Sequence, residues 1–120
     1  MTVTQIDPSG TVVSTTDLDW NAGSNTAAES IQMAMSDDAT LLVSRSDSNF
    51  STAAVMSIGS DGLLDWQLDL HEVLDDASYI RITDLIAGPD GRAMLSGEIM
   101  RASEDRGMLA ASINTSGELE

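Results

Sequence analysis

The chain has 120 residues, of which 42% are apolar, so it can bury one sizeable core but not two independent ones. Its 20 acidic residues against five basic ones give a formal net charge of -15, which disfavours binding to nucleic acids and to anionic membranes. Because the sequence also lacks cysteine and any apolar run long enough to span a bilayer, we expect a soluble domain with no disulfide, no nucleic-acid partner and no membrane partner.

The N-terminal stretch "VTQIDPSG" has an outline that recurs twice later in the chain, as "VMSIGSDG" and as "AASINTSG". Each copy has an apolar residue, an isoleucine three positions later, and then a turn that ends in glycine. Ile58 follows Ile6 by 52 positions, whereas Gly117 follows Gly62 by 55, as expected if one loop of the second unit is about three residues longer. The pattern predicts an internal repeat.

A second motif has the same period. The stretch "MSDDATLLVS" resembles "AGPDGRAMLS", and the match places Asp38 over Asp90 and Leu42 over Met94, again 52 positions apart. Two different motifs that agree on one period support a repeat more strongly than either motif does alone.

From Ile31 onward, each unit contains four short apolar segments. In chain order they are "IQMAMS", "TLLVSR", "AAVMSI" and "LLDWQLDL", then "IRITDLIA", "RAMLSGEI", "GMLAASI" and a truncated "ELE". The Asp, Asn, Ser and Gly residues between them let the chain reverse within a few residues, so consecutive segments are expected to pair as antiparallel hairpins. Strands this short cannot bury their apolar faces alone, so we expect an all-β fold whose sheets pack against one another.

A helix near residues 25–35 is the alternative interpretation. The stretch "TAAE" has the spacing of a capping box, and apolar residues follow it at helical spacing. The stretch "DLHEVLDDA" could likewise form a helical turn or two, and the chain would then be a small α+β domain. Against this alternative, Ile31, Met33 and Met35 alternate equally well as one face of a strand.

The repeat resembles the blade of bacterial β-propeller repeat proteins. The outline A-x-x-I-x-x-S-G-x-L-x-W, preceded by an apolar strand, a "PDG" turn and a strand that ends in Ser-Gly, is similar to blades that read "DG...VVGS...LVKLD..GN..W". The resemblance covers almost the whole chain and implies blades of four antiparallel strands. It divides a single domain, residues 1–120, into a half blade at 2–20, a blade at 26–70 and a blade at 79–120 with a truncated outer strand.

About two and a half blades cannot close a ring, and an open stack of sheets leaves an apolar face at each end. The resemblance therefore leaves two alternatives. Either copies of the chain assemble into a homo-oligomer that closes the ring, or the chain is a piece of a longer protein. A symmetric ring requires a heterologous interface, in which two different surfaces meet.

The resemblance implies a non-catalytic structural or ligand-binding module, with a protein or a carbohydrate as the possible ligand. Its loops before the inner strands would supply the contacts, and the candidate ligand-binding residues there are Trp20, Asn25, Asp76 and Tyr79. The alternative is a fragment of a propeller enzyme in which Asp and Glu perform acid-base chemistry on carbohydrate.

No residue pattern points to a catalytic centre, a metal site or a cofactor. The single histidine, His71, is expected on a solvent-facing loop, and no serine stands in the context of a nucleophile elbow. The acidic residues between Asp65 and Asp76 lack the alternating spacing of a calcium loop, so we expect a solvated acidic face. The Asp residues of the turns are expected to serve turn geometry.

Overall fold

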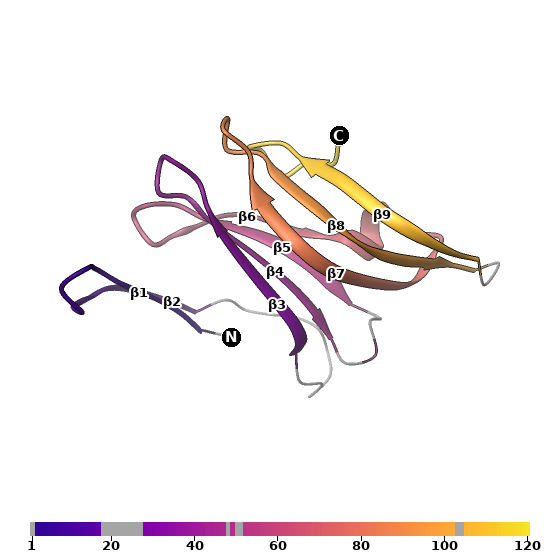
Figure 1. The fold of residues 1–120 in the computed structure, drawn as a ribbon, viewed down its shortest axis with the longest axis horizontal. Helices are drawn as coiled ribbons and strands as arrows, with labels where there is room; N and C mark the ends of the chain where they lie inside the picture. The colour runs from indigo at the N-terminus through magenta and orange to yellow at the C-terminus, as the bar shows by residue number, and fades with distance from the viewer. Residues whose placement is uncertain (1, 18–27, 48, 50–51, 103–104) are drawn as a thin grey trace.

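A computed structural model describes residues 2–17, 28–47, 49, 52–102 and 105–120 (Figure 1). Within these residues the chain forms nine strands and one helical turn. The elements are β1 (Thr2–Ile6), β2 (Val12–Asp17), β3 (Ala28–Met35), β4 (Leu41–Asp47), β5 (Ala53–Ile58), β6 (Leu64–Asp69), α1 (Leu70–Val73), β7 (Ala77–Ala87), β8 (Ala93–Arg101) and β9 (Arg106–Ile113). The expectation of an all-β fold is confirmed.

The strands form three antiparallel sheets in which each strand pairs with the next one along the chain. The first is the hairpin β1–β2, the second has the order β3-β4-β5-β6, and the third has the order β7-β8-β9. A bridge between Ile113 and Leu119 begins a fourth pairing at the outer edge of β9. The four-stranded sheet lies between the other two sheets (Figure 1).

Two strands from different sheets, and the turns before them, lie 52 positions apart in the sequence. Strands β2 and β6 begin at Val12 and Leu64, 52 positions apart, and both have six residues. The turns before them also match, because Gly10 and Gly62 both have positive φ and both donate a backbone hydrogen bond of 2.9 Å to the residue three positions earlier. We call positions 52 residues apart, or 55 apart from β5 to β9, in-phase positions.

The alternative of a helix near residues 25–35 is wrong for residues 28–35, which form strand β3. Pairing with β4 decides this: Met33 lies opposite Val43, and Ala34 lies opposite Leu42. Hydrogen bonds to β4 run along most of this segment, and they outweigh a weak capping signal. Residues 25–27 lie outside the described part of the chain.

The stretch "DLHEVLDDA" does contain a helical turn, α1, as the sequence allowed. Asp69 caps it, because its side chain accepts a 2.9 Å hydrogen bond from the backbone nitrogen of His71. Leu70 is fully buried in the core between the second and third sheets and anchors the turn. The helical turn thus connects β6 to β7 without opening the core.

The core has two parts, one on each face of the middle sheet. On one face, Leu42 and Val55 pack against residues of β7, β8 and β9. On the other face, a smaller cluster that includes Met56 and Ile58 packs against Val3 of the hairpin. Strands β4 and β5 are therefore covered on both faces, which explains why almost every residue of both strands is buried.

Candidate interface and ligand surfaces

The second and third sheets are joined by hydrogen bonds as well as by apolar packing. The backbone nitrogen of Ile82 donates to the Ser46 hydroxyl at 3.2 Å, and the Ser30 hydroxyl donates to the Ile82 carbonyl at 2.9 Å. The β7–β8 register shifts between Ile82 and Asp84, so this irregular point of β7 bonds with serines of the neighbouring sheet. These bonds fix how β7 lies against β3, and hence which face of the third sheet points outward.

Of the four predicted ligand residues, Trp20 and Asn25 lie outside the described residues. Asp76 forms an ion pair with Arg101, and its carbonyl accepts a 2.9 Å hydrogen bond from the nitrogen of Ala102. Tyr79 lies on β7 opposite Met100 and lines a hollow of about 320 Å³. Asp76 is not among the residues that line this hollow, so the structure does not bring these two predicted residues into one site.

The hollow beside Tyr79 contains polar groups that the sequence analysis missed. Glu98 of β8 and Arg106 of β9 line it together with Tyr79 and the highly exposed Met108. An aromatic ring, a carboxylate and a guanidinium are suited to polar ligands such as peptides or sugars. These residues come from three strands, so only the strand register could have identified them as neighbours.

A second hollow, of about 420 Å³, lies on the outward side of the same sheet. Its apolar part includes Ile86 of β7, Met94 of β8 and Ala110 of β9. Ile86 and Met94 are both about half exposed. Within the described residues nothing covers this outer face, whose apolar side chains come from all three strands.

The polar rim of this hollow has two carboxylates, and both have partners. Asp84 accepts a 2.9 Å hydrogen bond from the backbone nitrogen of Leu85. Glu120 accepts a 2.8 Å hydrogen bond from Arg92, whose side chain also pairs with Asp90 at 2.7 Å. The Arg92 contacts are exposed ion pairs, and the Asp84 contact is a local hydrogen bond within β7.

In-phase residues allow the outer face of the third sheet to be compared with the matching face of the second sheet. Leu42 and Met94 are in phase, but Leu42 is 0% exposed under the third sheet whereas Met94 is 46% exposed. Ala34 and Ile86 are also in phase. Ala34 packs against the core between the second and third sheets, whereas Ile86 is exposed on the outer face of the third sheet. The outer face of β7–β9 thus has the position of a face that another sheet covers elsewhere in the molecule.

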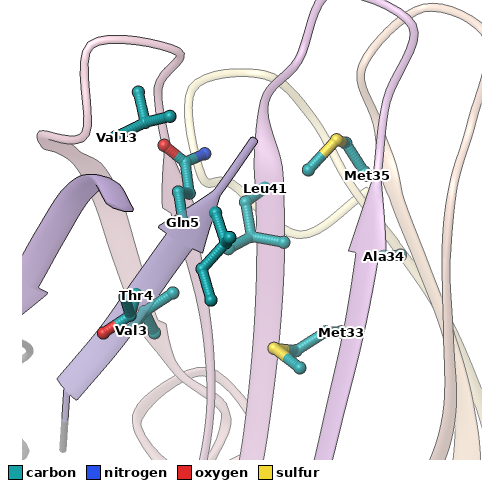
Figure 2. A pocket seen from close by; sticks show the side chains of 9 residues that line it. Val3, Thr4, Gln5, Val13, Met33, Ala34, Met35 and Leu41 are labelled. Atoms are coloured by element: carbon teal, nitrogen blue, oxygen red, sulfur yellow. The ribbon is translucent and has the colours of Figure 1, made fainter. Parts of the chain in front are cut away.

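A third hollow, a groove of about 430 Å³, lies between the β1–β2 hairpin and the β3–β4 hairpin. Figure 2 shows Met33 and Met35 projecting from β3 toward β1, with Leu41 between them and the side chains of the hairpin. Met33 is 64% exposed and Met35 is 59% exposed. Val3 and Gln5 line the opposite side of this groove, which is apolar and carries no charged side chain.

The turn aspartates act within their turns. The Ser9 hydroxyl donates to Asp7 at 2.6 Å, and this bond, with the backbone nitrogen of Thr11, holds the pKa of Asp7 below its ordinary value. The hydroxyl of Ser36 lowers the pKa of Asp38 in the same way. In each of these carboxylates, Oδ1 accepts more than one hydrogen bond from within its own turn.

The sequence analysis expected His71, the only histidine of the chain, on a solvent-facing loop, and this expectation is wrong. His71 is part of α1 and is half-buried, with Nδ1 at 3.2 Å from the carbonyl oxygen of Ala77. Within the described residues, no group of three or more His, Cys, Asp or Glu side chains could hold a metal ion.

The described residues contain no helix with the length and apolar character needed to cross a membrane. Comparisons of the chain with protein-family models, with curated proteins and with solved structures gave no match.

Proposed function

We propose that the chain is a non-catalytic structural module of propeller-like β-sheet blades, and that copies of it associate face to face to close a ring. The observation that carries this proposal is the contrast between the in-phase residues Leu42 and Met94. The first is buried by the next sheet, whereas the second is exposed on the outer face of β7–β9. A further sheet on that face would bury Ile86 and Met94 as the third sheet buries Leu42.

The outer side of the β1–β2 hairpin is the complementary surface in this proposal. A Cβ atom at Gly62 would lie 2.9 Å from that of Ser14, and one at Gly117 would lie 2.9 Å from Trp66, so each of these turns packs on the preceding sheet. At Gly10, the matching turn of the hairpin, no described atom lies within 4 Å. The hairpin of one copy is thus available to continue the stack on β7–β9 of the next.

The exposed side chains of the hairpin fit this role. Ile6 and Val12, which lie opposite each other in the hairpin, are both more than half exposed, although both are strongly apolar. Their burial against Ile86 and Met94 of a second copy would join two different surfaces, which is the heterologous arrangement that a ring needs. The predicted half blade and two blades would then be parts of a larger closed propeller.

The ligand-binding part of the proposal belongs to the hollow beside Tyr79. This hollow lies on the same outer face of β7–β9, at the end of the strands near Met100 and Arg106 and away from the Met94 end that the next copy would cover. Glu98 and Arg106 place a hydrogen-bond acceptor and a donor next to an aromatic ring there, which supports a protein or carbohydrate ligand. The alternative of a carbohydrate-cleaving enzyme stays a prediction. It would need two available carboxylates in one hollow. Asp84 and Glu120 both line the other hollow, but Glu120 already binds Arg92.

Light scattering coupled to size-exclusion chromatography tests the association. We expect the chain to elute with at least twice its monomer mass of 12.7 kDa. Met94→Glu should lower the mass to that of the monomer, because the variant places a charge in the proposed interface. Leu63→Glu is the matched control, since Leu63 is exposed in the turn before β6 and the variant adds the same charge.

Two results would contradict the proposed association. A monomer at all concentrations up to the millimolar range would overturn ring closure by association. Equal loss of mass in Met94→Glu and Leu63→Glu would show that added charge, and not the outer face of β7–β9, governs association.

A further inference from the structure

We propose that the free edge of β1, together with the groove beside it, binds an extended segment of a partner polypeptide as an added antiparallel strand. The segment would have aliphatic side chains at alternate positions. This site is separate from the outer face of β7–β9, so the proposal goes beyond self-association and does not depend on it.

The first step is the backbone edge. Among the described residues, β1 pairs only with β2. The backbone nitrogen of Asp7 donates to the Thr11 carbonyl at 2.9 Å, so Asp7 directs its amide toward β2. Because amide direction alternates along a strand, Thr4 and Ile6 direct theirs to the opposite edge. That edge offers the donors and acceptors that an added strand would bond.

The second step is the in-phase strand, which shows what such an edge accepts. Strand β5 is in phase with β1 and pairs with β6 on one side and with β4 on the other. In the β4–β5 ladder, Leu41 lies opposite Ile58 and Val43 lies opposite Met56. Ile6 is in phase with Ile58, so a strand like β4 would place an aliphatic residue opposite Ile6.

The third step is the floor of the groove. Met33 and Met35 project into it from β3 and are mostly exposed, as Figure 2 shows from close by. Their in-phase residues on β7 are Leu85 and Ala87; Leu85 is 4% exposed in the core, and Ala87 packs against that core. Methionines adapt their shape to different apolar partners, and about 430 Å³ suffices for the side chains of a short segment.

Charge selects among the segments that could bind. The groove itself carries no charged side chain, but the chain as a whole has a net charge of -15. An acidic segment would be repelled over long range, whereas a basic residue at its end would be attracted. Strand β4 itself combines alternate aliphatic residues with Arg45. The inferred partner is therefore an extended, aliphatic segment with basic rather than acidic flanks.

A synthetic peptide with the sequence of residues 40–45, TLLVSR, is a direct probe. With blocked ends and a fluorescent label, it should bind the full chain saturably in an anisotropy titration. A scrambled peptide of the same composition that breaks the alternation should bind at least tenfold more weakly, because only one face of the added strand meets the groove. Equal binding of the two peptides would overturn the proposal.

Matched glutamine variants locate the site. Met35→Gln should weaken binding at least fivefold, because it replaces an apolar floor residue by a polar one of similar shape. Val73→Gln introduces the same polar residue at an exposed apolar position of α1, which lines none of the three hollows described above, and should leave binding unchanged. Equal effects of the two variants would overturn the assignment to the groove.

A variant of the edge tests strand addition itself. Thr4→Pro removes the amide that faces the free edge and keeps those that face β2, so the hairpin should persist while peptide binding is lost. Circular dichroism of Thr4→Pro checks that the variant keeps the fold. If the variant unfolds, the binding measurement on Met35→Gln tests the proposal instead.

Light scattering on the same samples separates the two proposals. A monomer that binds the peptide supports this inference and overturns ring closure. An oligomer whose assembly is lost in Met35→Gln, and which binds no peptide, would assign the groove to a second copy and overturn the partner segment.

Discussion

At the scale of single residues, Gly97 shows how closely the backbones of the third sheet approach. A Cβ atom at Gly97 would lie 2.0 Å from the carbonyl oxygen of Arg81, next to the irregular point of β7. We expect Gly97→Ala to lower the free energy of unfolding by roughly 1–3 kcal/mol, because strand β8 must move away from β7. Urea denaturation followed by circular dichroism measures this change.

Gly107→Ala is the matched control for this prediction. A Cβ atom at Gly107 would meet the Cγ2 atom of Ile99 at 3.6 Å, an ordinary contact. The free energy of unfolding should therefore stay within about 0.5 kcal/mol of the wild-type value. Equal effects of the two alanines would contradict the close approach at Gly97.

Ala39 occupies a backbone conformation that favours glycine. Its φ is 65°, and its in-phase residue Gly91 has a φ of 81°. The left-handed conformation costs an L-residue roughly 1–2 kcal/mol, while glycine adds about 0.4–1 kcal/mol of entropy to the unfolded state. Ala39→Gly should thus raise the free energy of unfolding by up to about 1 kcal/mol. A fall in the urea midpoint of this variant would contradict the expectation.

The turn carboxylate of Asp38 gives a pH dependence with a definite sign. The Ser36 hydroxyl and the backbone of Thr40 lower its folded-state pKa below the ordinary value of 3.8. Its contribution to stability is therefore fully present above that value and is lost as the pH falls through the folded-state pKa. Asp38→Ala should lower the melting temperature more at pH 6 than at pH 2.5. An equal fall in melting temperature at the two pH values would contradict this role of the Asp38 carboxylate.

At the scale of secondary-structure elements, local sequence patterns predicted where the strands lie better than they predicted which strands pair with one another. The turn glycines and the alternation of Ile31, Met33 and Met35 were sufficient to place the strands and the all-β class. The competing capping signal before β3 is purely local, whereas the ladder with β4 is not visible in one segment. Pairing outweighed local helix propensity for this reason.

The candidate surfaces were less predictable than the strands. Tyr79 was found because it precedes an inner strand, but Glu98 and Arg106 join it only through the register of β7, β8 and β9. Two register shifts along β7, the first near Ser78, determine which side chains point outward. Such bulges leave no clear mark in the sequence, so the outer face of the sheet required the structure.

The polar contact between the second and third sheets carries a prediction at this scale. Ser46 is fully buried and accepts the hydrogen bond from the backbone nitrogen of Ile82. Ser46→Ala leaves that donor without its side-chain acceptor, so we expect a loss of about 1–3 kcal/mol in the free energy of unfolding. Ser60→Ala, in an exposed turn position, should change it by less than about 0.5 kcal/mol. A loss below that limit for Ser46→Ala would contradict a stabilising role for this hydrogen bond.

At the scale of the whole molecule, one packing arrangement is used twice. The turn at Gly62 packs on the hairpin, and the turn at Gly117 packs on Trp66 of the middle sheet, so successive sheets meet through in-phase residues. An arrangement that repeats has no natural end within the stack. The exposed apolar residues at both ends, such as Ile6 and Met94, follow from this geometry.

Net charge opposes the proposed association and gives it a salt dependence. Each copy carries a charge of -15, so two copies repel one another, while the surfaces proposed to meet are largely apolar. Raising the salt from 0.1 M to 1 M shortens the screening length from about 10 Å to about 3 Å, which removes most of the repulsion and leaves apolar burial intact. The mass measured by light scattering at a fixed low concentration should therefore rise with salt, and Met94→Glu should remain a monomer throughout. A mass that falls with salt would instead point to an interface held by ion pairs between the copies.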